Sequence, residues 1–388
     1  MNRWPLLALL AISPAAAAPA PRDVAIMVLS RSADAFYDAS VGQDGVAHPA
    51  LPRPVAGAAL AVRDILAIAR ATGISVKLDE KSLSPDDDVA QVVRDAGPDI
   101  AIVADLVGPD LIAAAKAAAG QIAVFNIRDD TDALRREACA LSLFHIPASI
   151  TGQTDALAQF VVRHNWRHVL LLTGPQNQDR ILADAFKASA AKFGARIVAD
   201  KPFVMGNDPR RREQNSVALM SYADDFDVAF VADTARDFGR AVPYLLARPR
   251  PVVGSVGLMA ADWDAIADRF GAPQVNNRFA KFAGRPMTSL DWAAWVGVRA
   301  VVEAVARKGA VTAVDVVARL EDGSVQLDVT KGVAASFRAW DHQLRQPIML
   351  RTADAVIDYA PIDGFLHQVT TLDTLGLGPG DVPCKLAR

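Results

Sequence analysis

The sequence predicts an α/β protein of two lobes, each a parallel sheet with helices on both faces. Short, continuously apolar segments alternate with amphipathic segments of helical length, which is typical of parallel strands joined by crossover helices. This pattern occurs twice along the chain without close sequence repetition. The chain has 388 residues, more than the roughly 250–300 residues at which a single hydrophobic core stops growing.

The first unit alternates apolar strands with helices that carry one apolar face. We predict strands at residues 24–29, 74–78, 99–104 and 122–126. Helices are predicted at residues 57–71, 86–96, 110–119 and 129–139. Gly73 ends the first of these helices, because glycine readily takes the left-handed conformation that closes a helix.

The second unit repeats the pattern after the segment 141–147. Strands are predicted at residues 169–172, 196–198, 228–232 and 252–254. Helices are predicted at residues 154–163, from about 179 to 194, and at 238–246. Two further helices, at residues 290–308 and 313–321, cannot stand alone, so we expect them to complete the two lobes already built.

Composition narrows the class of protein. Apolar residues make up 52% of the chain and charged residues 22%, which is typical of a globular protein and not of a disordered one. There are 41 basic and 44 acidic residues, and the formal charge is −3. Because nucleic-acid binding proteins carry a strong basic surface, this balance argues against nucleic acid as a partner.

Residues 1–18 have the features of a secretory signal. A positively charged start is followed by the apolar run 6–12 and by small residues, and this order is typical of export signals. The apolar run is too short to span a bilayer. We therefore expect an exported mature protein located in the periplasm.

The chain contains two cysteines, Cys139 and Cys384. In an oxidising compartment such a pair can form a disulfide. The alternative is two separate thiols, buried or free. Two cysteines so far apart in sequence make a weak metal site.

Motifs of catalysis are absent from the sequence. There is no Gly-x-Ser-x-Gly elbow, phosphate-binding loop, dinucleotide fingerprint or His-Glu-x-x-His motif. His164 and His168 have a spacing that can hold a metal, but they flank a predicted helix-to-strand junction, so we interpret them as solvated. The sequence predicts a protein that is not an enzyme and has no catalytic cofactor.

Polar residues follow the predicted strands, at the sheet edge where ligands of parallel α/β proteins bind. Such edges, together with exposed helix N-termini, suit anions. The candidates are Asp105, Asn126 and Arg128 in the first unit, and Gln176, Asn177, Asp179, Asp233, Thr234 and Ser255 in the second. The alternative is structural, since Asp129 or Asp130 fits a helix cap. Arg128 has no such capping role.

Three tryptophans stand near these segments. Trp292 and Trp295 lie three residues apart at the start of a predicted helix, and Trp263 follows the last predicted strand of the second unit. Two interpretations are open. These aromatic side chains either pack in the core or provide a flat surface on which a planar ligand stacks.

Several segments together resemble a known family. They are residues 144–148, 276–279, 283–287, 291–295, 337–340, 343–347, 364–367 and 373–376. The chain resembles the type I periplasmic binding proteins of the Leu/Ile/Val-binding group. Within that group it looks like the substrate-binding proteins associated with pyrroloquinoline quinone-dependent catabolism, which include a binding protein for the quinone itself.

The resemblance implies a two-lobed fold with three crossovers. The implied lobes are residues 23–147 plus about 275–340, and residues 148–274 plus about 345–388. It implies a monomer that binds a small molecule by closing its lobes and docks on the permease and ATPase subunits of an inner-membrane ABC importer.

The resemblance also implies pyrroloquinoline quinone as the bound ligand. Amino-acid binders of the group carry Ser and Thr in the loops where this chain has Asp105 and Arg128. The quinone is planar and carries three carboxylates, which an arginine fork suits. Arg128 with one of the tryptophans would meet those needs.

Rival functions remain open at this stage. The same fold could bind a small organic acid, an amino acid or an alcohol-pathway metabolite. It could instead sense a ligand for a membrane kinase. An enzyme is a third reading, but no nucleophile and base pair supports it.

Overall fold

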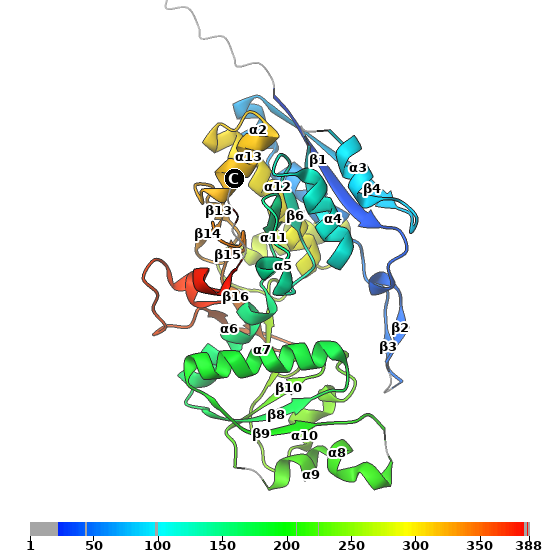
Figure 1. Ribbon diagram of the computed structural model, residues 1–388, viewed down its shortest axis with the longest axis vertical. Coiled ribbons are helices and arrows are strands. Elements are labelled where there is room, and N and C mark those ends of the chain that lie inside the picture. The colour runs from blue at the N-terminus through cyan, green and yellow to red at the C-terminus, as the bar shows by residue number, and fades with distance from the viewer. Residues whose placement is uncertain are drawn as a thin grey trace, which may run out of the picture.

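The computed structural model describes residues 22–42, 45–97, 100–206, 208–223, 225–383 and 386. The predicted signal, residues 1–18, and Cys384 lie outside the described residues. Cys139 is disulfide-bonded, and its pairing with Cys384 stays a prediction. In the described part of the chain, no helix combines the length and apolarity needed to cross a membrane. Two lobes are stacked along the long axis of the molecule (Figure 1).

Lobe 1 is built on a five-stranded sheet of order β4-β1-β5-β6-β7, in which all neighbours are parallel. Its strands are β1 (Arg22–Arg31), β4 (Ile74–Leu83), β5 (Ile100–Asp105), β6 (Val124–Asn126) and β7 (Leu143–His145). Its helices are α1 (Val55–Asp64), α2 (Leu66–Thr72), α3 (Val89–Asp95), α4 (Gly108–Ala118), α5 (Ala133–Arg136), α11 (Ala272–Ala283), α12 (Ser289–Lys308) and α13 (Ala313–Glu321).

Both faces of the lobe 1 sheet are covered, as continuous apolar strands require. Side chains of a strand alternate between the two faces. On β1, Ile26 and Val28 accordingly pack in the core that contains α1 and α12. Met27 and Leu29 pack in the core that contains α3 and α4.

Lobe 2 holds a four-stranded parallel sheet of order β11-β10-β8-β9. Its strands are β8 (His168–Thr173), β9 (Arg196–Pro202), β10 (Val228–Ala232) and β11 (Val252–Gly254). Its helices are α6 (Ile150–Arg163), α7 (Asn177–Phe193), α8 (Arg212–Asn215), α9 (Val217–Tyr222) and α10 (Val242–Leu245). Helices α6 and α7 cover one face, and α9 and α10 cover the other.

The helix expected at 129–139 is shortened to α5 because Asp129 holds a turn. Its carboxylate accepts hydrogen bonds from the N–H and hydroxyl of Thr131. The helix expected at 57–71 is divided at Ile65 into α1 and α2. The helix expected at 238–246 is reduced to a turn of 3₁₀ helix and α10, because Asp233 takes the N–H groups of Phe238 and Gly239.

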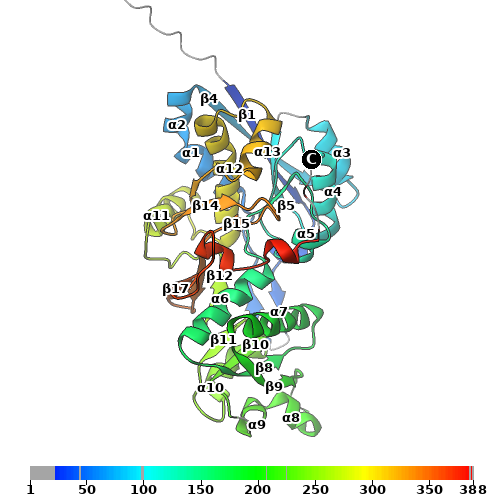
Figure 2. The same cartoon turned by 60° about the vertical axis from the view of Figure 1, so that its left-hand side comes forward.

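Among the described residues, three crossover segments join the lobes, between β7 and α6, between β11 and α11, and between β15 (Leu344–Arg345) and β16 (Ile348–Arg351). Strand β16 pairs antiparallel with β12 (Met259–Ala261) and β17 (Val356–Ala360). Figure 2 shows this small sheet between the lobes. Ile348 and Leu350 enter the lobe 2 core, whereas Met349 enters the lobe 1 core.

Gln346 joins the three crossovers. Its side-chain amide donates to the carbonyl of Ile146 at 2.6 Å and to Asp262 at 3.1 Å. Its side-chain oxygen accepts from the Lys331 ammonium at 2.5 Å. Burial lowers the pKa of Lys331 to about 7, and the charge of Asp262 opposes that effect. The crossovers are therefore fixed by buried polar contacts and not by apolar packing alone.

Arg135 is fully buried in the same region, and all three nitrogens of its guanidinium donate hydrogen bonds. Nε donates to the side-chain oxygen of Gln343 at 2.7 Å. Nη1 donates to the carbonyls of Asp129 and Thr131, and Nη2 to the carbonyl of Pro147 at 2.8 Å. Arg135 thus connects the loop after β6 with the first crossover and with Gln343, the residue before β15.

The buried imidazole of His342 should make the free energy of unfolding depend on pH. The ring is buried against Phe144, with centroids 4.5 Å apart, and Nδ1 lies 3.2 Å from the carbonyl of Leu143. Burial lowers the pKa of His342 to about 4. Between about pH 6.5 and pH 4 the unfolded chain therefore binds one more proton here than the folded protein. The contribution of His342 to the free energy of unfolding should therefore fall by about 1.4 kcal/mol per pH unit as the pH falls through that window. Burial also lowers the pKa of His145, which adds to this slope, and raises the pKa of Asp130 to about 6, which opposes it.

Urea unfolding at pH 4 to 7 checks this expectation with the variant His342→Asn. Asparagine tolerates the positive φ of 52° at this position and carries no titrating ring, so the variant should lose the slope contributed by His342. His367→Asn, at an exposed position, is the control and should keep the wild-type slope. Equal slopes in all three proteins would contradict the assignment.

Candidate functional site

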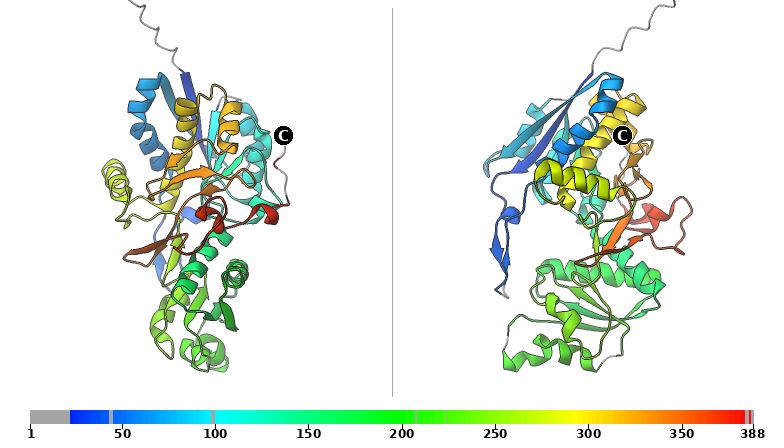
Figure 3. Two further views of the ribbon diagram at one scale, coloured as in Figure 1. Left: turned by 90° about the vertical axis from the view of Figure 1, so that its left-hand side faces the viewer. Right: turned by 180° about the vertical axis from the view of Figure 1, so that it is seen from behind.

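Six residues gather where the strands of lobe 1 end, and we call them the Arg128 cluster. They are Asp34, Phe36, Tyr37, Arg53, Asp105 and Arg128. Asp105 is the last residue of β5, and Arg128 follows β6. The other four come from the long connection between β1 and α1, which also forms the hairpin of β2 (Ser40–Val41) and β3 (Ala47–His48). Figure 3 shows that hairpin extending from lobe 1 toward lobe 2.

Arg128 lies between two carboxylates. Its Nη1 is 2.7 Å from Asp34 Oδ2, and its Nε is 3.4 Å from Asp105 Oδ1. Only 8% of the Arg128 side chain is exposed. The hydroxyl of Tyr37 donates to Asp105 Oδ2 at 2.7 Å. The cluster therefore holds a buried arginine between the carboxylates of Asp34 and Asp105.

Aromatic rings flank the guanidinium groups. The Arg128 guanidinium carbon lies 5.0 Å from the ring centre of Phe36, and that of Arg53 lies 4.5 Å from the ring centre of Tyr37. These distances are those of cation–π contacts. Phe36 is 48% exposed whereas Tyr37 is buried, so Phe36 leaves part of an apolar surface open beside Arg128.

Burial and charge set the ionisation of the cluster. Burial raises the pKa of Asp105, although Tyr37 and Arg128 oppose this. Burial would also raise the pKa of Asp34, but Arg128 and the N–H of Phe36 outweigh it, so the pKa of Asp34 is lowered. Burial raises the pKa of Tyr37. Asp34 is thus held as a carboxylate beside a charged arginine.

Several buried polar atoms of the cluster lack a hydrogen bond. They are Arg53 Nη1, Arg128 Nε, Arg128 Nη1 and Asp105 Oδ1. Arg128 is ion-paired, but neither Nε nor Nη1 makes a well-formed hydrogen bond. Three of these atoms still face an opposite charge, because Arg128 Nη1 lies by Asp34 and Arg128 Nε lies by Asp105 Oδ1. Buried polar groups are nearly always satisfied, so atoms without a well-formed hydrogen bond are candidates for contact with a ligand.

Lobe 2 presents a hollow of about 180 Å³ where its own strands end. Its polar lining comprises Gln153, Thr154, Thr234, Arg236 and Ser255. Gln153 also donates to Asp130, two residues beyond Arg128, at 2.9 Å. The rim of the lobe 2 hollow and the loop that carries Arg128 are therefore joined by this hydrogen bond.

Some predicted lobe 2 residues have structural roles instead. Asp179 is fully buried and accepts hydrogen bonds from Thr234 and from the N–H of Gln176. Asp233 is buried and accepts from three backbone N–H groups. These carboxylates shape the loops, and Thr234 and Ser255 line the hollow. Gln176 and Asn177 are exposed at the start of α7 and do not line it.

Asn126 is also a loop-forming residue and not an available ligand group. Its side-chain oxygen accepts from the N–H groups of Arg128 and Asp129. Its amide donates to the carbonyl of Asp129 at 2.6 Å and lies 3.0 Å from His145 Nδ1. The side chain is fully buried with its bonds made, and its contribution is to present Arg128.

The three tryptophans do not form the predicted stacking surface for a planar ligand, because their side chains are buried. Trp292 and Trp295 are fully buried, and Trp263 is 2% exposed. All three belong to the lobe 1 core, where Trp263 and Trp292 stack with ring centres 5.7 Å apart. The indole N–H groups of Trp263 and Trp295 donate to Asn276 and Asp64. They therefore offer no face to a ligand.

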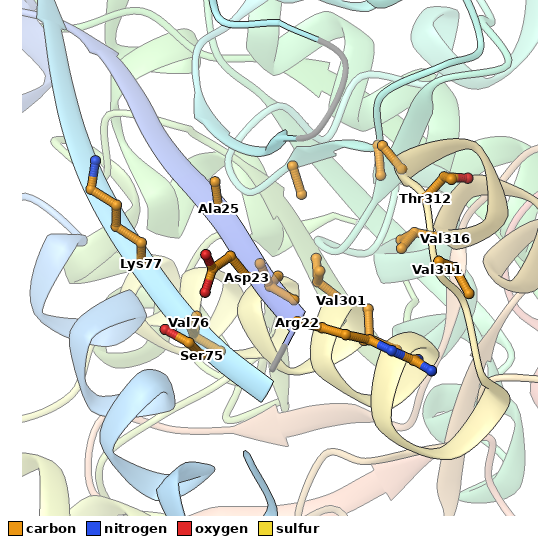
Figure 4. A pocket seen from close by; sticks show the side chains of 15 residues that line it. Arg22, Asp23, Ala25, Ser75, Val76, Lys77, Val301, Val311, Thr312 and Val316 are labelled. Atoms are coloured by element: carbon orange, nitrogen blue, oxygen red, sulfur yellow. The ribbon is translucent and has the colours of Figure 1, made fainter. Parts of the chain in front are cut away.

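A larger hollow, of about 760 Å³, lies elsewhere, at the amino-terminal ends of β1 and β4 (Figure 4). Its labelled lining includes Arg22, Asp23, Lys77, Val301 and Val316, the last two from α12 and α13. Ligands of parallel α/β proteins bind at the carboxyl ends of strands. We therefore place the candidate site at the Arg128 cluster and the lobe 2 hollow.

Sequence reasoning missed the residues of the long β1–α1 connection. Asp34, Phe36, Tyr37 and Arg53 lie in a polar, proline-containing stretch with no regular pattern. A usable signal was present, because this stretch follows a buried strand just as the loops of Asp105 and Arg128 do. Arg236 was also missed, although it lies in the same loop after β10 as the predicted residues Asp233 and Thr234.

Comparison with known proteins supports the fold. No protein-family model matches the chain, and no curated protein matches it in sequence. A periplasmic binding protein from Burkholderia mallei superimposes with a TM-score of 0.63 at 13% identity, covering 94% of this chain and 99% of that one. A branched-chain amino acid ABC transporter ligand-binding protein from Burkholderia xenovorans has a TM-score of 0.67 at 15% identity, covering 87% and 94%.

A third solved structure is the branched-chain amino acid transporter substrate-binding protein of Streptococcus pneumoniae in complex with isoleucine. Its TM-score is 0.58 at 18% identity, with coverage of 87% of this chain and 99% of that one. The chain therefore has the two-lobed α/β fold of type I periplasmic binding proteins, as the sequence predicts.

Proposed function

We propose that this protein is a periplasmic solute-binding protein that delivers a small carboxylated molecule to an ABC-type importer. The observation that carries the proposal is the Arg128 cluster, a buried guanidinium ion-paired with Asp34 and Asp105 at the edge of the sheet where this fold binds ligands. Charged hydrogen bonds from arginine to carboxylate are among the strongest polar contacts available to a protein. The proposed partners are the permease and ATPase subunits of the importer.

Pyrroloquinoline quinone is the ligand that we propose. The quinone needs arginine for its carboxylates and an apolar face for its rings. Arg128 and Arg53 supply two neighbouring guanidinium groups, and the half-exposed ring of Phe36 beside Arg128 supplies the face that the tryptophans do not. The hydroxyl-lined hollow of lobe 2 would complete the site when the lobes close.

An amino acid is the second candidate. Related folds include the isoleucine complex from Streptococcus pneumoniae. Asp34 and Asp105 lie on either side of Arg128, so the cluster has carboxylates that could hold an ammonium group as well as an arginine for a carboxylate. A ligand with both charges fits this arrangement, and leucine is the probe that represents it.

Titration of ligand-stripped protein tests both candidates. Pyrroloquinoline quinone should bind saturably with one-to-one stoichiometry by calorimetry, and its absorption band should shift as it enters the site. Arg128→Gln should weaken binding by about tenfold to a hundredfold, because a buried carboxylate of the ligand loses its charged partner. Arg31→Gln, which removes an arginine paired with Asp110 outside the cluster, is the matched control.

The outcomes separate the candidates. Unchanged quinone affinity in Arg128→Gln would remove the central contact of the proposal. Binding of leucine without binding of the quinone would favour the amino-acid function. Absence of saturable binding of either probe would contradict both.

A further inference from the structure

The two carboxylates beside Arg128 are held very differently. The Asp105 side chain is 1% exposed, ends strand β5 and accepts the Tyr37 hydroxyl at 2.7 Å. The Asp34 side chain is 18% exposed and lies in the connection after β1. Besides Arg128, its carboxylate accepts the N–H of Phe36 at 3.1 Å, which it caps, and interacts electrostatically with Arg53. The Asp105 side chain is therefore fixed by the strand and by Tyr37, whereas the Asp34 side chain can move more easily.

We propose that Asp34 is an internal competitor for Arg128. In this structure its carboxylate takes the position at the guanidinium that a carboxylate of the ligand would take, and it must move away for that ligand to bind. Asp34 therefore sets the affinity and the selectivity of the site for anions. This inference rests on the proposed function, in which Arg128 receives a carboxylate.

The geometry favours Asp34 as the group that leaves. Displacing Asp105 would leave a buried carboxylate and the buried Tyr37 hydroxyl unpaired, which is costly. Displacing Asp34 releases one ion pair, of 2.7 Å, from a side chain that already reaches solvent. The N–H of Phe36 lies near the surface of the loop, where water can replace the cap.

Competition of this kind reduces the apparent affinity by the fraction of molecules in which Arg128 is available. A ligand with a single carboxylate gains one arginine contact but loses the Asp34 contact, so its net gain is small. A ligand with several carboxylates can use Arg53 and Arg128 together, since both guanidinium groups lie against the Tyr37 ring, at 4.5 and 5.6 Å. The site should therefore discriminate against simple monocarboxylates.

The test is the variant Asp34→Asn. Asparagine keeps the size of the side chain and the oxygen that caps the Phe36 N–H, but it removes the charge that pairs with Arg128. Affinities for pyrroloquinoline quinone, citrate and acetate are measured by calorimetry at fixed salt. We expect binding of the quinone and of citrate to tighten by about tenfold, and detectable acetate binding to appear.

Asp64→Asn is the matched control. Asp64 is also a mostly buried lobe 1 aspartate, 15% exposed, and pairs with Arg278 at 2.9 Å. Its substitution should leave all three affinities unchanged. In the double variant Asp34→Asn with Arg128→Gln, the gain should vanish, because the gain arises only at Arg128.

Each outcome has a distinct meaning. If the wild type binds the quinone and Asp34→Asn binds it equally or more weakly, Asp34 is a contact or a scaffold and the inference is overturned while the proposed function stands. If Asp34→Asn binds citrate through Arg128 but neither protein binds the quinone, the inference is supported and the proposed ligand is wrong. If no carboxylate binds to either protein, both are overturned.

Discussion

Replacement of Arg135 by methionine should lower the free energy of unfolding by about 3–5 kcal/mol. Arg135 is fully buried, and its guanidinium serves the side chain of Gln343 and three backbone carbonyls. Methionine fills part of the volume but leaves the side-chain oxygen of Gln343 and the carbonyl of Thr131 without a donor. The carbonyls of Asp129 and Pro147 keep the amides of Asn126 and Gln343 as donors but lose the arginine. The network is mostly buried, so the cost exceeds that of an ordinary surface substitution.

Urea unfolding at pH 7, followed by far-ultraviolet circular dichroism, measures this effect. Arg136→Met is the matched control, because Arg136 is the next residue in α5 and pairs with Glu137 at the surface. The control should change stability by no more than about 0.5 kcal/mol. If both variants lost the same stability, helix propensity and not the buried network would be the cause.

Truncation of Trp292 should have an effect of similar size. Trp292→Ala removes a fully buried indole that stacks on Trp263 and lies under the ammonium of Lys331, 4.0 Å from the ring centre. Large-to-small changes of this type cost about 3–5 kcal/mol. Tyr244→Ala, which truncates an aromatic residue that is 86% exposed, should cost about 0.5 kcal/mol or less.

A milder substitution of Trp292 separates a role in the core from a role in ligand binding. Trp292→Phe, which retains an aromatic ring, should be less stable than the wild type but bind the proposed quinone with unchanged affinity. A loss of affinity out of proportion to the loss of stability would place Trp292 in the binding site and contradict the assignment to the core.

Strands with continuous apolar sequence were predictable almost residue by residue. Strands β10 and β11 have the predicted bounds, and so does helix α13. Their patterns are local, since burial of a strand on both faces shows directly as a run of apolar residues. Helix α5 was overestimated because a side chain, Asp129, competes for the N–H groups that would begin it.

The site was predictable only in outline. The expectation that polar residues following parallel strands meet at one edge of the sheet was correct for Asp105 and Arg128, which lie in contact. It could not tell that Asn126 bonds within its own loop, or that Asp179 bonds to Gln176 and to Thr234 in the loop after β10, because these contacts depend on loop conformation. The tryptophans were ambiguous for a related reason. Helix α12 is apolar around most of its circumference, so spacing alone does not identify the face that meets a ligand.

The position of strand β16 between the two cores has a consequence for how the protein unfolds. Its alternate side chains belong to different cores, Ile348 and Leu350 to lobe 2 and Met349 to lobe 1. Loss of structure in either lobe removes the support from one face of this strand and exposes apolar side chains that the other lobe also needs. We therefore expect the two lobes, although each has its own sheet, to unfold together as one cooperative unit.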